Sequence, residues 1–446
     1  MNVPVMDDRT IRTSLLALAP DHRFPQGIRC SGFFVGAADM TTEKLVICGH
    51  GMVAQRLLEC LSGYSNHGFS PIVVISGEPA AAYNRILLSA VLAGDADPDS
   101  LALQTDDWYR QRGIELRQGD PVRRIDRSRR QVVTNEGHIE SYDRLVLATG
   151  SRSASLGLAG ETLSGVVGFR DLQDTNTLIR LSQHHRRAVV IGGGFLGLEA
   201  AEGLRQRGMD VTVLHRGPHL LNRQLDATGG ALLKTSLTKR GLTIQTGTAP
   251  IALLGKQAVR AVQLDDDTLI RTDLVVIAAG ITPNSELARE AGLACGRAVR
   301  VDGQLRTSDD AIFAVGECAQ VGETTSGLVE PGYQQAEVLA QVLAQPGCDR
   351  HYTPTVVPTR LKISGIPIFS CGQTDADHGT ESLVWQDYET NRYCRLLIRH
   401  QRLTGAVLFG ITDDGPWYTQ RIQQADDISA DRANLAFGQA YCGALA

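Results

Sequence analysis

The sequence has no two cysteines close together. Its nine cysteines are scattered, and the nearest pair, Cys48 and Cys60, is twelve residues apart. Local redox-active disulfides, zinc ribbons and iron–sulfur clusters use closely spaced cysteines, so this spacing argues against all three. The odd count and the scatter are typical of a reduced cytoplasm, where cysteines serve as small buried hydrophobic residues.

Long apolar runs and an excess of one charge are also missing. No apolar stretch approaches the roughly 18 residues that span a bilayer. The apolar residues 15–19 are too few for a secretion signal and follow the acidic Asp7 and Asp8. The chain carries 44 basic and 49 acidic residues without a basic stripe, which disfavours a nucleic-acid partner. We therefore expect a cytoplasmic protein that neither crosses a membrane nor binds nucleic acid.

Glycine is abundant, and its placement carries the first strong signal. A glycine-rich turn joins a short strand to a helix between residues 44 and 59, with Gly49, Gly51 and Ala54 at the spacing G-x-G-x-x-A. A second strand follows and leads to the acidic Glu78. This is the dinucleotide-binding fingerprint, in which the pyrophosphate lies at the amino end of the helix.

The same unit returns 143 residues later. Residues 188–202 again form a strand, a turn and a helix, with Gly192, Gly194 and Gly197 at the spacing G-x-G-x-x-G. One glycine triplet is weak evidence, but two in one chain, each between a β-branched strand and an amphipathic helix, are specific. The sequence therefore predicts two dinucleotide sites.

Three later strands close on small residues. The first ends at Ala148-Thr149-Gly150, the second at Gly280, and the third at Gly316, which Glu317 follows. The first two are typical of crossovers between domains. Glu317 stands at the mouth of a strand–helix turn, where it can accept a hydrogen bond from a polyol hydroxyl or cap the helix. Beyond residue 351, short alternating strands indicate a small α+β domain.

The order of these motifs resembles the FAD-dependent pyridine-nucleotide oxidoreductases over roughly residues 44–345. The resemblance implies an α/β fold with two Rossmann-like dinucleotide-binding domains, in which an inserted NAD(P) domain splits the FAD domain. The implied boundaries are 1–43 for a poorly ordered extension, 44–151 and 272–350 for the FAD domain, 152–271 for the NAD(P) domain, and 351–446 for a C-terminal α+β interface domain.

The resemblance also assigns the FAD site. Gly49, Gly51 and Met52 would lie against the pyrophosphate, and Glu317 would hold the ribityl chain. Arg85 would neutralise phosphate charge, unless it is a surface arginine. Glu78 would bind the ribose, although the first residue after the strand, where relatives have the acid, is Gly77. The other FAD or crossover positions are Val53, Ala54, Ser89, Ala148, Thr149, Gly150, Gly280 and Gly316.

The second fingerprint would hold the nicotinamide coenzyme through Gly192, Gly194, Phe195, Leu196 and Gly197. Glu199 would orient the nicotinamide, unless it is a solvated helix carboxylate. No catalytic acid or base is needed, because the flavin supplies the chemistry. His215 and Arg216 occupy the place of the acid that binds NADH, and a cationic pair favours the phosphate of NADPH. Similar relatives with basic or neutral residues there use NADH, so we favour NADH and leave NADPH open.

Departures from the family narrow the branch. No cysteine pair is present, Ala90 stands where many relatives have a flavin-contacting lysine, and Glu317 replaces an aspartate. The segment from Tyr83 to Ser89 resembles the flavin modules of assimilatory nitrate reductase and NAD(P)H nitrite reductase. The sequence has no cysteine cluster that could hold the sirohaem and iron–sulfur centre of a complete nitrite reductase. We therefore expect electrons to pass to a separate iron–sulfur and molybdenum nitrate reductase subunit, with metal sites there and none in this chain.

Two alternatives stay open. The acceptor can instead be a separate nitrite reductase, a ferredoxin or a rubredoxin, because the chemistry is the same up to the flavin. A protein of another class, a non-catalytic flavoprotein that senses the nicotinamide state, would be reduced slowly. The rate of flavin bleaching by NADH separates the two classes.

Overall fold

The computed structural model describes residues 42–363 and 365–442. The extension expected at residues 1–43 therefore lies outside the described residues, except for its last two positions, and Glu43 already belongs to a strand. No helix in the described ranges is long and apolar enough to cross a membrane.

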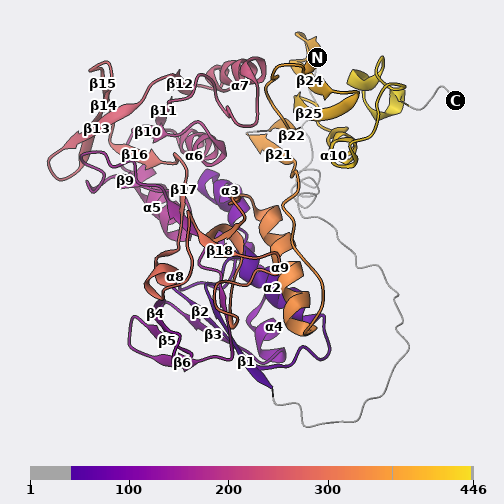
Figure 1. The fold of residues 1–446 in the computed structure, drawn as a ribbon. Helices are drawn as coiled ribbons and strands as arrows, with labels where there is room; N and C mark the ends of the chain where they lie inside the picture. The colour runs from indigo at the N-terminus through magenta and orange to yellow at the C-terminus, as the bar shows by residue number, and fades with distance from the viewer. Residues whose placement is uncertain (1–41, 364, 443–446) are drawn as a thin grey trace. The chain divides into compact units, whose positions relative to one another are not determined.

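The first glycine turn belongs to a five-stranded parallel sheet with the order β19-β7-β1-β2-β3 (Figure 1). Leu45, Val46 and Ile47 of β1 are fully buried, as expected for a central strand covered on both faces. The carboxyl ends of parallel strands share one edge, so the ends of β1, β7 and β19 meet there. The strands are β1 (Glu43–Cys48), β2 (Phe69–Ser76), β3 (Ile114–Gln118), β7 (Arg144–Leu147) and β19 (Ile312–Ala314).

The second glycine turn belongs to a second parallel sheet with the order β12-β11-β10-β16-β9. β16 lies beyond residue 271, where the sequence placed the return to the FAD domain, yet it pairs with β10. Its four residues are buried, so this apolar strand is part of the second core. The strands are β9 (Val166–Val167), β10 (Arg187–Ile191), β11 (Asp210–His215), β12 (Thr243–Thr246) and β16 (Leu274–Ile277).

The chain passes between the two sheets along a pair of antiparallel strands, β8 (Ser151–Ser153) and β17 (Ile281–Pro283). β19 then completes the first sheet from a segment far along the chain. The predicted α/β class, with two Rossmann-like domains of which the first is split, is confirmed.

A third sheet, antiparallel and with the order β21-β22-β25-β24-β23, forms the C-terminal part. Helix α10 (Gly415–Gln424) packs against β22 and β25, and the strands expected in this region are present. The elements are β21 (Thr359–Ile363), β22 (Ile366–Gly372), β23 (Glu381–Asp387), β24 (Arg392–Arg399), β25 (Arg402–Phe409), and the short 3-10 turns η4 (Leu435–Phe437) and η5 (Gln439–Tyr441).

Helices cover the two parallel sheets, and three further small sheets belong to the same part of the chain. In the first domain, α2 packs along α9. The helices are α2 (Met52–Ser62), α3 (Leu88–Ala93), α4 (Asp106–Gln111), α5 (Leu172–Ser182), α6 (Phe195–Gln206), α7 (Ala227–Lys239), α8 (Glu286–Glu290) and α9 (Val329–Ala344), with 3-10 turns η1 (Arg85–Leu87), η2 (Pro98–Leu101) and η3 (Gly316–Cys318). The small sheets are β4 (Val122–Asp126), β5 (Gln131–Thr134), β6 (Ile139–Ser141); β13 (Pro250–Gly255), β14 (Val259–Leu264), β15 (Leu269–Arg271); and β18 (Val299–Val301), β20 (Ala319–Val321).

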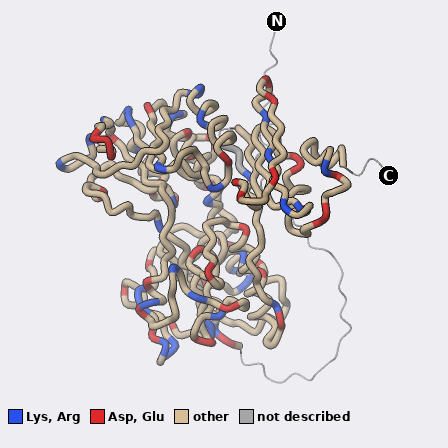
Figure 2. The backbone as a smooth tube through the Cα atoms, turned by 45° about the horizontal axis from the view of Figure 1, so that its top comes forward, with Lys and Arg blue, Asp and Glu red and all other residues tan. Residues whose placement is uncertain are grey.

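Positive and negative residues are interspersed along the described chain (Figure 2). Many of them meet as ion pairs, among them Glu78 with Arg85 and Arg170 with Glu317, which belong to the site described below.

Candidate FAD and coenzyme sites

The first glycine turn is shaped for a phosphate. Gly49 has φ +103°, and a Cβ there would lie 2.2 Å from the carbonyl oxygen of Ala148, so no other residue fits. Gly51 precedes α2 without a side-chain cap, and a Cβ there would meet nothing within 4 Å. The amino end of α2 therefore faces open space with unpaired N–H groups, which is the arrangement that binds a pyrophosphate.

The second turn repeats this geometry. Gly192 has φ +131°, and its Cβ would lie 2.3 Å from the carbonyl oxygen of Ala278, while the Cβ of Gly194 would meet nothing. Gly197 is the third glycine for a steric reason, since a Cβ there would lie 1.9 Å from the carbonyl oxygen of Gly192. Phe195 and Leu196 begin α6 and are half-buried. The internal repeat seen in the sequence is thus a repeat of structure.

Two buried nitrogen atoms show that the first site fits a polar ligand. His50, between the two glycines of the first turn, is buried, and its Nδ1 has no partner among the described residues. Burial lowers the pKa of His50 to about 4, so the ring is neutral. Nε of Arg170 is likewise buried without a partner. Orphaned buried polar atoms are rare, and the described residues have three of them. Two belong to residues of the candidate FAD site, which fits a polar ligand there, and the third is Nη1 of Arg432 in the C-terminal part.

Arg170 was missed by the sequence reasoning. Its Nη2 lies 2.6 Å from Oε2 of Glu317 and donates to Oγ of Ser151 at 2.8 Å. The hydroxyl of Ser151 also donates to Glu317, at 2.7 Å. Glu317, expected to hold the ribityl chain, therefore shares its carboxylate with a cation at the crossover. The available signal was an arginine directly before Asp171, which caps α5.

Glu78 and Arg85, which the sequence assigned to different parts of FAD, form an ion pair with each other. Tyr83 donates its hydroxyl to Oε2 of Glu78 at 2.7 Å, and Arg85 donates to the carbonyl oxygen of Arg170 at 3.0 Å. Arg85 is therefore tied into the domain rather than free on the surface. Three side chains from the segment after β2 and the backbone carbonyl of Arg170 are thus joined in one polar network.

The residues at the crossover between the two domains bond to one another. Thr149 donates its hydroxyl to the carbonyl oxygen of Asn284 at 2.8 Å, and Asn284 returns a bond to the carbonyl oxygen of Thr149 at 2.8 Å. Gly150 and Gly280 both have positive φ, at +63° and +126°, which lets the chain leave each strand sharply. Ala148, Thr149 and Gly150 therefore follow β7 beside the first turn, whereas Gly280 follows β16 beside the second turn.

Glu199 lies where the two nucleotide domains meet. Helix α6 packs on α3 so closely that a Cβ on Gly203 would lie 2.9 Å from Cγ of Leu92. Ser89 donates a hydrogen bond to Glu199, and burial raises the pKa of this carboxyl to about 7. Glu199 is thus a half-buried carboxyl that Ser89 holds at this contact. Where many relatives have a lysine, this chain has Ala90, and the side chain that bonds to Glu199 is the hydroxyl of Ser89.

His215 lies against the second glycine turn, and Gly193 donates its backbone N–H to His215 Nδ1 at 3.2 Å. Arg216, the next residue, is exposed. Burial lowers the pKa of His215, so this position supplies a neutral ring, not the cation that the sequence pair His-Arg suggested.

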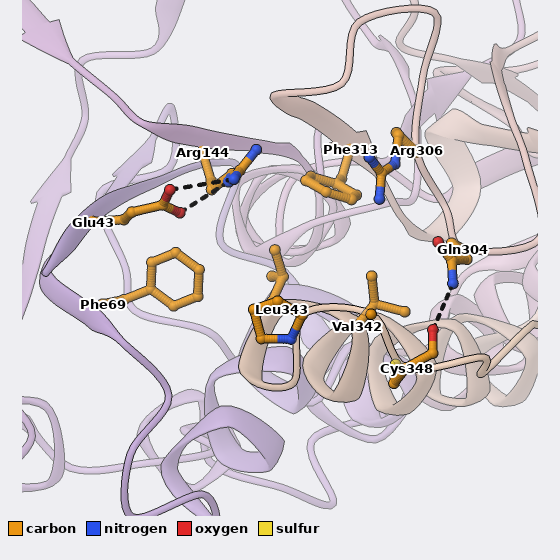
Figure 3. Close-up of a pocket in the computed structure, with 11 residues that line it drawn as sticks. Glu43, Phe69, Arg144, Gln304, Arg306, Phe313, Val342, Leu343 and Cys348 are labelled. Carbon is orange, nitrogen blue, oxygen red and sulfur yellow. Dashed lines mark hydrogen bonds and ion pairs between the residues drawn. The ribbon is translucent and has the colours of Figure 1, made fainter. Parts of the chain in front are cut away.

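A cavity of about 350 Å³ lies at the amino ends of the strands of the first sheet, the edge opposite the glycine turn (Figure 3). Its wall includes Glu43, Phe69 and Arg144, the first residues of β1, β2 and β7. Arg144 pairs with Glu43 at 2.9 Å, and Gln304 donates to the carbonyl oxygen of Cys348 at 2.9 Å. These polar groups satisfy one another, and the cavity is separate from the glycine turns.

The eight described cysteines are free. Burial raises the pKa of the Cys48 thiol, at the end of β1, to about 12, with the neighbouring Cys318 as a second cause. Neither thiol near the first turn is therefore a thiolate at neutral pH.

Comparison with known proteins agrees with this geometry. The family model described as pyridine nucleotide-disulphide oxidoreductase matches residues 43–338, well over half of the chain. The chain belongs to this family. Its members are FAD-dependent and use NADH or NADPH. A second model, the rubredoxin NAD+ reductase C-terminal domain, matches residues 358–426.

Individual relatives place the chain within the family. It is 39% identical to a Bacillus subtilis nitrite reductase [NAD(P)H], over 87% of this chain and 48% of that protein. It is 38% identical to the B. subtilis assimilatory nitrate reductase electron transfer subunit, over 89% of this chain and 51% of that protein. The chain thus spans about half the length of these relatives. The putidaredoxin reductase–putidaredoxin complex contains a chain with a TM-score of 0.77 and 27% identity, covering 86% of this chain and 94% of that one.

Proposed function

We propose that this chain oxidises NADH through bound FAD and passes the electrons to an iron–sulfur and molybdenum subunit of an assimilatory nitrate reductase. The observation that carries the redox part is the pair of matching glycine turns on two adjoining parallel sheets. The similarity to an assimilatory nitrate reductase electron transfer subunit supports the choice of acceptor.

The FAD site would be built by both segments of the first domain together with Arg170, which follows β9 of the second sheet. The amino end of α2, with Gly49, Gly51, Met52, Val53 and Ala54, would hold the pyrophosphate. Arg170 would add a donor from its unpaired Nε, and Glu317 would accept from the ribityl hydroxyls. When bound, FAD would accept a hydride from NADH and release electrons singly to the acceptor.

The chain's own residues would bind and orient, without acid–base catalysis. The amino end of α6 would hold the coenzyme pyrophosphate, and the packing of α3 on α6 sets the spacing between the two nucleotide domains. Glu199 would orient the nicotinamide, since it lies at this contact beside Ser89. We propose the domain limits as 43–150 and 284–350 for FAD, 154–280 for NAD(P), and 351–446 for the C-terminal domain.

Bleaching of the flavin's visible band tests the redox part. The FAD-loaded chain should be reduced by NADH faster than about one per second, in the range of ordinary kcat values. Slower reduction would favour the non-catalytic sensor. A kcat/KM for NADPH at least about tenfold above that for NADH would contradict the choice of coenzyme.

The acceptor is tested separately. Purifying the chain from its native cell and analysing the metals of what accompanies it should find molybdenum and iron. The alternative acceptor, a separate nitrite reductase, is supported by the similarity to a nitrite reductase. Finding sirohaem without molybdenum would favour that alternative, and finding a ferredoxin or rubredoxin would favour a small iron–sulfur acceptor.

A further inference from the structure

His215, the last residue of β11, and Leu221 of the loop after it both bond to Gly193, the middle residue of the second glycine turn. Leu221 donates its N–H to the carbonyl oxygen of Gly193 at 3.0 Å, and Gly193 donates its own N–H to His215 Nδ1 at 3.2 Å. A Cβ on Gly193 would lie 2.7 Å from Cγ of His215 and 2.7 Å from Cδ2 of Leu220. The middle residue of the turn is therefore glycine because the histidine ring lies on it.

These bonds fix the tautomer of His215. A backbone N–H can only donate, so Nδ1 must present its lone pair and the ring hydrogen must be on Nε2. Nε2 lies 3.3 Å from Oδ1 of Asn222, so Nε2–H donates to that amide oxygen, with the backbone carbonyl of His219 as a second acceptor. The amide oxygen of Asn222 is thereby engaged, and its NH₂ group is left to donate to a ligand.

This pair stands where NADH-binding domains place an acid. A carboxylate there accepts hydrogen bonds from the adenosine ribose and repels the 2′-phosphate of NADPH. Here the position holds a neutral ring with an amide beside it. Arg216 and Arg223 on the same loop are exposed. Within the described residues, neither forms an ion pair.

We propose that Asn222 contacts the adenosine ribose of the coenzyme, with His215 as its positioning residue, in place of the usual acid. The inference rests on the proposed use of a nicotinamide coenzyme. It makes discrimination between NAD+ and NADP+ weak, because nothing at Asn222 repels a phosphate.

Calorimetric titration of the FAD-loaded full chain with NAD+ or NADP+ tests the contact without turnover. One net hydrogen bond is worth about 1 kcal/mol, so Asn222→Ala should weaken both affinities about fivefold. The matched control is Asn135→Ala, the same change at an exposed asparagine of the first domain, which should bind both as the parent does. An Asn222→Ala variant with parental affinities would overturn the proposal.

The charge variant Asn222→Asp gives a second, independent readout. Its carboxylate can still accept from His215 and can also accept from the ribose, so NAD+ binding should be retained. NADP+ binding should fall at least about tenfold, because a carboxylate beside the 2′-phosphate repels it. Equal effects on the two coenzymes would contradict the proposal. If the parent chain binds neither NAD+ nor NADP+, the proposed function itself fails.

The role of His215 is tested by a double-mutant cycle. If His215 acts through Asn222, then His215→Ala and Asn222→Ala should each weaken NAD+ binding, and the double variant should lose little more than either single one. Additive losses would show that the two residues act separately and would overturn the positioning role. Unchanged FAD content and unfolding temperature confirm that each variant is folded.

Discussion

The hydroxyl of Tyr393 donates to Oδ2 of Asp226 at 2.6 Å, across the boundary between the C-terminal sheet and the coenzyme domain. Both side chains are buried. Arg395 adds a charged bond to the same oxygen at 3.0 Å, and Asp226 Oδ1 accepts from the backbone N–H of Gly229 as the cap of α7. The carboxylate of Asp226 thus caps α7 at the end of the loop after β11, and it also bonds the C-terminal sheet to the coenzyme domain.

Removing this hydroxyl should loosen the C-terminal domain. Tyr393→Phe leaves a buried carboxylate short of one donor, and a bond to a charged group is worth about 2 kcal/mol. Urea unfolding should show a loss of that size. The control Tyr388→Phe, at a side chain that is 83% exposed, should change stability by less than about 0.5 kcal/mol. Equal stability of the two variants would contradict a role for this bond.

The two helix-capping glycines provide a matched pair of predictions. A Cβ at Gly51 or at Gly194 meets no protein atom within 4 Å, so an alanine at either place should leave the chain folded. The methyl group would stand where a pyrophosphate approaches the backbone. We therefore expect Gly51→Ala to purify with little FAD, and Gly194→Ala to keep FAD but bind NAD+ at least about tenfold more weakly.

Each glycine variant is the control for the other. FAD content is read from the visible absorption of the purified chain, and NAD+ binding from calorimetry. Should Gly194→Ala lose FAD while Gly51→Ala keeps it, the assignment of the two turns would be reversed.

Glu199 predicts a pH dependence of stability. Its pKa is about 7 in the folded chain against 4.5 for a free glutamate, so the folded state binds the proton more tightly. The stabilisation of the folded state by this tighter proton binding is fully present below about pH 4.5 and is lost as the pH rises through about 7. The side chain of Glu199→Gln cannot titrate. The free energy of unfolding of this variant, relative to that of the parent, should therefore rise by about 2 kcal/mol between about pH 5 and pH 8.

Unfolding curves at several pH values measure this difference. Glu290→Gln, at an exposed position of α8, is the control and should follow the parent at every pH. A constant difference between Glu199→Gln and the parent would mean that the carboxyl is already ionised at low pH.

Periodicity and glycine spacing were enough for the two parallel sheets, because a buried strand followed by a glycine turn leaves a local pattern. The pairing of β16 with β10 was not predicted, since a four-residue apolar strand fits either sheet. The ion pair of Glu78 with Arg85 and that of Glu317 with Arg170 were also out of reach. The second joins residues 147 positions apart, and no local rule fixes such contacts. Likewise, position 193 must be a glycine because of the His215 ring, 22 residues further along the chain.

Arg170 gives the sharpest test of the FAD site, because the sequence did not suggest it. Its Nη2 is paired with Glu317, whereas its Nε is buried without a partner. Such a donor is costly until a ligand accepts from it. Arg170→Ala removes a charged donor worth about 2 kcal/mol, so the dissociation constant for FAD should rise about thirtyfold.

Arg170→Lys keeps the charge but cannot reach two partners in the fixed geometry of a guanidinium, so its FAD affinity should lie between those of the parent and the alanine variant. Arg152→Ala is the control, since Arg152 is also at the crossover but bonds to the exposed Glu286 and to Asn284. Titrating FAD into the apoprotein and following flavin fluorescence measures all three. If Arg170→Ala and Arg152→Ala bind FAD equally well, the unpaired Nε does not face the cofactor, and the FAD path must run elsewhere along the strand ends.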